Sequence, residues 1–361
     1  MSKSQTYIFY IALIFISYIL ILLSERVQFG NIRIIKKNND IKINLSANIF
    51  RALAFMILLI PLVKRKCGAD TPVYYFDYTY DRIYSFDRTF SYILKGLHKF
   101  IPDPQIGLGL VSTISLGLVF IAFIMVKDIV DIRLSFFAYF TLLYFYLYNY
   151  MRIMLAVSII MIGYSLVIQG KRKVAIIPFA FASLIHLSSI IIILIYITVL
   201  NFGKYKRVII ASSIIILFVF LMSPASFLSL ITTERYREQI NYASLGMMSI
   251  GFGTLIRALP ILYLLWIYGH KYKGNIIYNY IIIFAIANVV FSFIGYYVGV
   301  ASRISNMYLV YHLVYGVPFI VKDETNNRRR QIVSWFFVLY CFVMYYMISK
   351  NFETMNIVPY F

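Results

Sequence analysis

The stretch VAIIPFAFASLIHLSSIIIILIYITVL, residues 174–200, decides how the rest of the chain is arranged. Its 27 residues contain no Asp, Glu, Lys or Arg, and a straight helix of this length would measure about 40 Å, against about 30 Å for the hydrocarbon core of a bilayer. His186, Ser188 and Ser189 interrupt the run near its middle. A broken helix is tolerated at membrane depth only where it is buried in protein or lines a cavity. The pattern predicts a re-entrant segment that breaks near His186; two tilted short spans are the alternative.

The composition of the whole chain is that of an integral membrane protein. Hydrophobic residues make up 61% of the 361 residues, charged residues make up 13%, and the mean hydropathy is +0.81. A soluble domain has about 25% charged residues. Apolar runs that approach or exceed the length of a membrane-spanning helix occupy residues 7–23, 46–63, 108–126, 134–148, 153–168, 174–200, 208–230, 251–269, 276–298, 304–321 and 332–349. The sequence therefore predicts an all-α polytopic membrane protein, with about ten or eleven transmembrane helices in a single domain over residues 1–361.

The net charge of +20 indicates membrane topology rather than nucleic-acid binding, because the basic residues gather in short loops between the apolar runs. These loops lie at 26–42, 127–133, 171–173, 204–207, 271–273 and 322–330. The positive-inside rule places them in the cytoplasm, and it places the N-terminus and the loop 64–107 outside. One straight crossing at 174–200 would put every later basic loop on the opposite side. This conflict is a second reason to expect a re-entrant segment there.

Neither a metal nor a cofactor is expected. Cys67 and Cys341 are the two cysteines of the chain, and neither stands near a second cysteine or a histidine at ligand spacing. No Walker-type, dinucleotide-binding or HExxH pattern occurs. His98 and His312 stand at predicted interfaces and His270 in a basic loop, and we assign none of the three a role.

The outer loop 64–107 contains polar residues that could act on a substrate. Its first part, KRKCGADTPVYYFDYTYD at 64–81, carries Asp70, Asp77 and Tyr74 among other acidic and aromatic residues. Tyrosine is common at a bilayer interface, but the carboxylates are not explained in this way. A carboxylate can deprotonate a hydroxyl group, and tyrosine can stack on a sugar ring. Further along, apolar residues recur at helical spacing, which predicts an amphipathic helix near 82–100.

Two arginines stand at the predicted outer ends of apolar runs, Arg152 in NYMRIMLAVSII and Arg303 in GVASRISNMYLV. An arginine at membrane depth costs at least about 2.5–3.5 kcal/mol on insertion scales, so it usually faces a cavity or a partner. Snorkelling to the interface is the structural alternative. Guanidinium groups hold phosphate oxygens in a forked geometry and stay charged at any working pH. The pair therefore indicates an anion site, with His186 at the predicted break as a further candidate.

Three stretches together resemble the EpsG family of Wzy-type polysaccharide polymerases: KRKCGADTPVYY, the segment from NYMRIML to HLSSIIII, and ASRISNMYLVYHLVYGVPFI. The resemblance rests on their order and spacing over roughly residues 46–320. The matching positions are Lys66, Gly68, Asp70, Tyr74, Asn149, Arg152, Gly170, Lys171, His186, Ser188, Ser189, Arg303, Asn306 and Tyr308. The family usually has arginine where Lys66 stands and commonly glutamine where Ile153 stands. Lysine is a poorer bidentate phosphate ligand than arginine.

The resemblance implies a GT-C-like glycosyltransferase of the bacterial inner membrane, multi-pass, with its active site facing the periplasm or cell exterior. It would transfer a growing glycan from undecaprenyl diphosphate to the non-reducing-end sugar of a lipid-linked repeat unit. Its product would be O-antigen, capsule or exopolysaccharide. Donor and acceptor are thus undecaprenyl-diphosphate-linked oligosaccharides, and membrane lipid and a chain-length regulator are further expected partners. No nucleic acid and no cofactor are implied.

The residues that we expect at the site divide into two groups. The catalytic candidates are Asp70, Arg152, His186 and Arg303. The substrate-binding candidates are Lys66, Tyr74, Asp77, Asn149, Ser188, Asn306 and Tyr308. The arginines would stabilise the charge that develops on the leaving diphosphate. Either Asp70 or His186 could be the base for the acceptor hydroxyl, and Asp70 is preferred because it lies in the outer loop.

Three other functions compete with this interpretation. A flippase for lipid-linked oligosaccharides would share the substrate and a cationic cavity, but it would need a path open alternately to both faces. A membrane O-acyltransferase could use His186, but its chemistry should lie on the cytoplasmic side. A structural scaffold explains neither the arginine pair nor the segment around Asp70.

Overall fold

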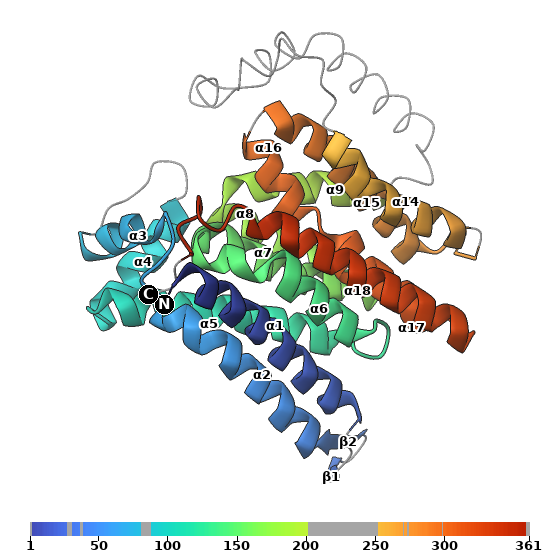
Figure 1. Ribbon diagram of the computed structural model, residues 1–361. Coiled ribbons are helices and arrows are strands. Elements are labelled where there is room, and N and C mark those ends of the chain that lie inside the picture. Colours follow the sequence, from blue (N-terminus) through green and yellow to red (C-terminus); the bar gives the residue numbers. More distant parts are fainter. Residues whose placement is uncertain are drawn as a thin grey trace.

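The computed structural model describes residues 2–26, 31–36, 39–80, 88–200, 252–269, 271–272, 274–297 and 299–358. The expected span 208–230 and the basic loop 204–207 lie outside these residues. The prediction of an all-α polytopic membrane protein is confirmed (Figure 1). One short antiparallel hairpin interrupts the helices: β1 (Asn31–Lys36) pairs with β2 (Asn39–Asn44).

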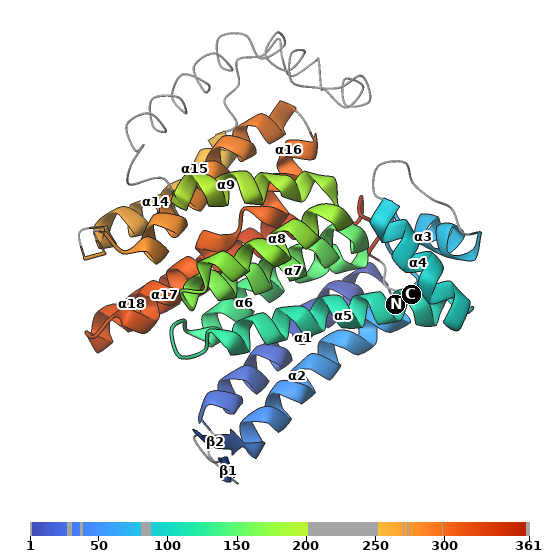
Figure 2. The same cartoon turned by 180° about the vertical axis from the view of Figure 1, so that it is seen from behind.

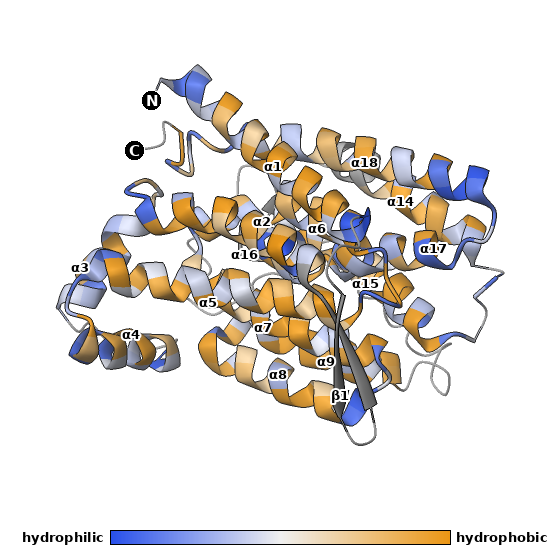
Figure 3. Cartoon of the chain, turned by 90° about the horizontal axis from the view of Figure 1, so that it is seen from below, coloured by the Kyte–Doolittle hydropathy of each residue, from blue (hydrophilic) through white to orange (hydrophobic). Residues whose placement is uncertain are grey.

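Seven helical segments of the described chain are long and apolar enough to cross a membrane. They are Lys3–Arg26, Ser46–Lys64, Pro104–Met125, Met151–Ile168, Ile276–Gly295, Ala301–Asp323 and Asn327–Ser349. Shorter apolar helices cover Ile132–Leu142, Leu187–Leu200 and Ala258–Tyr268. Figure 3 shows that apolar residues dominate the long helices, with polar residues toward their ends, as a lipid environment requires.

The bounds of the helices follow the expected runs closely. In chain order they are α1 (Lys3–Arg26), α2 (Leu45–Lys64), α3 (Thr71–Thr79), α4 (Arg88–Phe100), α5 (Pro104–Met125), α6 (Ile132–Leu142), the 3₁₀ turn η1 (Tyr144–Tyr148), α7 (Met151–Ile168), α8 (Arg172–Ile185), the 3₁₀ turn η2 (Leu187–Ser189), α9 (Ile190–Leu200), α14 (Phe252–Tyr268), α15 (Ile276–Tyr297), α16 (Gly299–Arg303), the π turns η3 (Ile304–Tyr308) and η4 (His312–Gly316), α17 (Val317–Asp323) and α18 (Asn327–Ser349).

The predicted break at His186 is confirmed. α8 ends at Ile185, and His186 has extended backbone angles, φ −144° and ψ 114°. α9 then returns along α8. The Tyr196 hydroxyl, near the end of α9, donates to the carbonyl of Arg172 at the start of α8. Figure 2 shows the two helices side by side. With lengths of about 21 Å and about 17 Å, neither helix crosses the hydrocarbon core alone. This return path favours the re-entrant segment over two tilted spans.

The segment 64–107, which was predicted to be an outer loop, is mostly helical in the part that the structure describes. The amphipathic helix is confirmed as α4 from Arg88 to Phe100, and the remainder of the expected range, 82–87, lies outside the described residues. Phe90 and Leu94 are buried on its inner face. The short helix α3 was not predicted. Asp103 then ends the loop by accepting hydrogen bonds from the backbone N–H groups of Gln105 and Ile106, which caps α5.

Two π turns shape the segment that follows α15. The backbone N–H of Leu309 donates to the carbonyl of Ile304 at 3.2 Å, five residues earlier. The side-chain amide of Asn288 on α15 donates to the carbonyl oxygens of Ser305 at 2.6 Å and Leu309 at 3.2 Å. Asn288 thereby satisfies carbonyl groups in the irregular turn, and π turns of this kind occur frequently at functional sites.

The two ends of the helix bundle differ in their residues. At one end, which we call the Asp70 end, the segment after α2 meets the C-terminal segment that follows α18. The backbone N–H groups of Gly68 and Ala69 donate to the carbonyls of Asn356 at 2.7 Å and Met355 at 2.9 Å. At the other end, the basic end, lie the end of α1, the start of α8 and the start of α18 (Figure 1). Arg26, Arg172 and Arg328 to Arg330 lie there.

Candidate functional site

The backbone around Asp70 is held by the turn that precedes α7. Asp70 occupies the N-cap position of α3 without using its carboxylate as a cap. Its backbone N–H donates to Oδ1 of Asn149 at 2.8 Å, and the Asn149 side chain is buried. The carboxylate of Asp70 is thus left for other interactions while its main chain is fixed. Residues 70 and 149 were both expected at the site, and the structure brings them into contact.

Arg152 and Arg303 lie close enough to Asp70 to act on its charge. Partial burial raises the pKa of the Asp70 carboxyl above its ordinary value of 3.8, and the guanidinium groups of Arg303 and Arg152 oppose this shift. The Arg303 guanidinium also lies over the ring of Tyr150, 5.3 Å from its centroid. Tyr150 directly precedes α7, the helix that carries Arg152. Residues from three distant parts of the chain therefore place two cations beside one carboxylate.

Tyr74 joins α3 to the start of α7 and lies beneath the site rather than on its surface. Its side chain is 7% exposed, and its ring packs against Phe90. Burial raises the pKa of Tyr74 to about 12, and the backbone of Arg152, which hydrogen-bonds the hydroxyl, counteracts the shift. Asp77, one turn further along α3, is also buried. We interpret both as supports of the loop that carries Asp70.

The basic residues before Asp70 differ in exposure. Lys66, the expected ligand, is exposed. Its neighbour Arg65 is buried, donates to Oγ of Ser112 at 3.3 Å and lies 5.9 Å from the ring centroid of Tyr148. Tyr148 belongs to the turn that positions Asn149. Arg65 therefore contacts the residues that hold the site, and this role was not predicted, because neither residue type nor spacing separates two consecutive basic residues.

The broken segment reaches the same part of the molecule through Tyr308. The imidazole of His186 is stacked on the Tyr308 ring, with 6.3 Å between centroids and 14° between planes. Tyr308 is buried and lies one turn beyond Arg303. Ser188 in η2 is partly buried, and Ser189 donates its hydroxyl to the carbonyl of His186. The break in the segment 174–200 thus packs on the π turn that follows Arg303.

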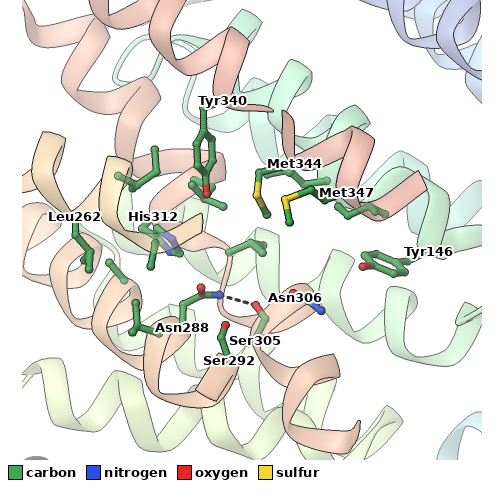
Figure 4. Close-up of a pocket in the computed structure, with 18 of the residues that line it drawn as sticks. Tyr146, Leu262, Asn288, Ser292, Ser305, Asn306, His312, Tyr340, Met344 and Met347 are labelled. Atoms are coloured by element: carbon green, nitrogen blue, oxygen red, sulfur yellow. Dashed lines mark hydrogen bonds between the residues drawn. The ribbon is translucent and has the colours of Figure 1, made fainter. Parts of the chain in front are cut away.

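A cavity with both polar and apolar lining residues adjoins the π turn on the side of α15 and α18 (Figure 4). Asn306, an expected binding residue, is exposed and lines it. His312 lines it as well and is 5% exposed, although we had assigned it no role. The residue follows an irregular π turn, and a plain helical reading of 304–321 could not show which way its side chain points. Within the described residues, no group of three His, Cys, Asp or Glu side chains is placed to hold a metal ion.

Gly68 has a role that other residues cannot fill. Its φ is +111°, and a Cβ atom there would lie 2.3 Å from the carbonyl oxygen of Tyr148. We expect Gly68→Ala to displace the turn between Tyr148 and Asp70 and to reduce chain extension by about 10²-fold, the cost of misplacing a catalytic group by about 1 Å. The measurement is the initial rate of chain extension by the purified protein in liposomes.

Gly170→Ala is the matched control for this change. Gly170 also has a positive φ, +79°, but no atom lies within 4 Å of its Cβ position. The control carries the backbone strain without the crowding at the site. An equal loss of activity in both variants would show that backbone strain alone causes the loss and that the position of the Asp70 turn does not.

Comparison with known proteins shows the family of the chain. The family model that matches the chain is described as the EpsG family, and the match covers residues 48–361. The chain belongs to the EpsG family. This EpsG-family protein is therefore, in general terms, a Wzy-like polysaccharide polymerase of the glycosyltransferase type. No curated protein and no solved structure matched the chain, so the GT-C-like architecture stays a prediction.

Proposed function

We propose that this EpsG-family protein polymerises oligosaccharide repeat units carried on undecaprenyl diphosphate. The growing glycan is the donor, and the non-reducing-end sugar of a new lipid-linked unit is the acceptor. The observation that carries this proposal is the convergence of Arg152 and Arg303 on Asp70. Two cations beside one carboxylate suit a reaction that releases a diphosphate and takes a proton from a hydroxyl group.

The bonds made and broken follow from these groups. The acceptor hydroxyl oxygen forms a bond to C1 of the donor's reducing-end sugar, and the bond between C1 and the diphosphate oxygen breaks. Undecaprenyl diphosphate leaves with the electron pair, and Arg152 and Arg303 stabilise its developing charge. Asp70 accepts the hydroxyl proton, and the raised pKa of its carboxyl makes it a stronger base than an ordinary aspartate. His186 is the alternative base and otherwise a substrate contact.

The proposed location is the bacterial inner membrane with the Asp70 end outside. The basic end carries Arg172 and the run Arg328 to Arg330, which the positive-inside rule assigns to the cytoplasm. Under this orientation the re-entrant helices α8 and α9 enter from the cytoplasm, and His186 lies at their outer tip. The substrates would be joined on the outer side, where a chain-length regulator would also act.

Complementation of a deletion strain tests this function. We expect the deletion to leave single repeat units at the surface and the wild-type gene to restore a ladder of long chains on a gel of surface glycan. If the protein were a flippase, the deletion strain would instead export no repeat units. A wild-type protein that is present in the membrane by blot but restores no ladder would contradict the polymerase proposal.

A further inference from the structure

The cavity beside the π turn has a neutral lining in which apolar side chains are mixed with hydrogen-bonding ones. Its volume is about 100 Å³, enough for several water molecules or for the hydroxyl-bearing edge of one sugar ring. Residues from α14, α15, α18 and the π turns line it, and no Asp, Glu, Lys or Arg is among the lining residues that the structure describes. The cavity is therefore chemically distinct from the neighbouring cluster of Asp70, Arg152 and Arg303.

Figure 4 shows how the walls are divided. Asn288, Ser292 and Ser305 lie on one wall, and Tyr340, Met344 and Met347 on α18 lie on the opposite wall. Both amide hydrogens of Asn288 are used by the π turn, which leaves its carbonyl oxygen to accept a hydrogen bond from a ligand. Amide and serine hydroxyl groups thus face the thioether groups of α18 across the space.

His312 is the polar group that points to a ligand. The side chain is 95% buried, and its Nδ1 has no hydrogen-bond partner within the described residues. The backbone of Leu309 also interacts with the imidazole, so at least one ring nitrogen remains for a ligand. Leaving a buried polar atom unpaired costs about 1–3 kcal/mol, and a bound hydroxyl group would remove that cost.

We infer that this cavity is the acceptor subsite, and that it binds the terminal neutral sugar of the acceptor through hydroxyl groups. This inference rests on the proposed function. Asn306 lines the cavity three residues after Arg303, so a sugar seated there lies beside the group that holds the diphosphate. A prenyl chain is a poorer occupant, because it would leave His312 and the amide oxygen of Asn288 without partners. An anionic sugar is disfavoured, because no Lys or Arg is among the lining residues that the structure describes.

Competition with a lipid-free oligosaccharide tests the inference. The full-length protein in liposomes is given lipid-linked repeat unit purified from the deletion strain, and the repeat unit freed from its lipid by mild acid is added as inhibitor. Ser292→Phe fills the cavity, and His312→Asn is the milder change. We expect half-inhibition to need at least about tenfold more free oligosaccharide for Ser292→Phe and about three- to tenfold more for His312→Asn.

Two controls separate the possible occupants. Ile286→Phe places the same phenylalanine side chain on α15 but away from the cavity, where Ile286 is 48% exposed, and should behave as wild type. Undecaprenyl phosphate should inhibit all variants equally. Unchanged inhibition of both cavity variants by the free oligosaccharide would overturn the inference. Weaker inhibition by undecaprenyl phosphate alone would assign the cavity to the lipid chain instead.

A binding measurement distinguishes failure of this inference from failure of the proposed function. Calorimetry with the detergent-solubilised protein and the free oligosaccharide reports sugar binding even if no polymer forms. One outcome is that no polymer forms, but wild type binds the oligosaccharide and Ser292→Phe and His312→Asn weaken this binding. That outcome would overturn the polymerase proposal and keep the sugar site. If polymer forms but wild type and both variants bind the oligosaccharide equally, the polymerase proposal stands and the sugar site is overturned.

Discussion

Replacing Arg152 by alanine is expected to lower the rate of chain extension by about 10²–10³-fold, the usual cost of removing a preorganised group that stabilises transition-state charge. Arg152 lies at the start of α7, and its guanidinium acts on the Asp70 carboxylate together with that of Arg303. Without it, one cation remains to stabilise the charge on the leaving diphosphate. The measurement is the initial rate in liposomes, supported by a gel of surface glycan that shows single units in place of a ladder.

Arg152→Lys shows which property of the side chain is needed. Lysine keeps the charge but loses the forked geometry that holds two phosphate oxygens, so we expect an intermediate rate. Arg51→Ala is the matched control, because Arg51 on α2 pairs with Glu25 at 2.6 Å, at the far end of α1 from the site. A full ladder from a well-expressed Arg152→Ala protein would show that the arginine only anchors the helix at the interface.

The break at His186 was predictable because it depends on local properties of the sequence. The apolar run 174–200 is too long for one crossing, and His186 and two serines interrupt it. Helix positions elsewhere follow from the same property, the length of each apolar run. The amphipathic helix α4 was equally local, since the spacing of its apolar residues alone defines a buried face.

The convergence of the site could not be derived from spacing. Asp70, Arg152 and Arg303 come from different parts of the chain, and only their resemblance to family motifs grouped them before the fold was known. Their proximity in space depends on the turn 144–150, which carries both Asn149 and Tyr150. The support from Asn288 was hidden for a related reason: an asparagine in an apolar run does not reveal that a π turn on another segment needs its amide.

Replacing Asp70 by asparagine is expected to reduce chain extension by about 10²–10⁴-fold, the range for loss of a general base. The pH dependence identifies the base. The carboxylate is the active form, so the wild-type rate should fall as the pH falls through the pKa of Asp70, which burial has raised above 3.8. Because Arg303 lowers this pKa, Arg303→Gln should raise it and move the acid limb to higher pH. The residual rate of Asp70→Asn should lack that limb.

Asp103→Asn is the matched control for this experiment. Asp103 belongs to the same segment 64–107, but its carboxylate caps α5, a task that asparagine performs as well. The control should keep both the wild-type rate and the wild-type pH profile. If Asp70→Asn retained the acid limb at the wild-type position, the titrating base would be another group. His186, stacked on Tyr308 beside the π turn, would then take that role, and Asp70 would serve to orient the arginines.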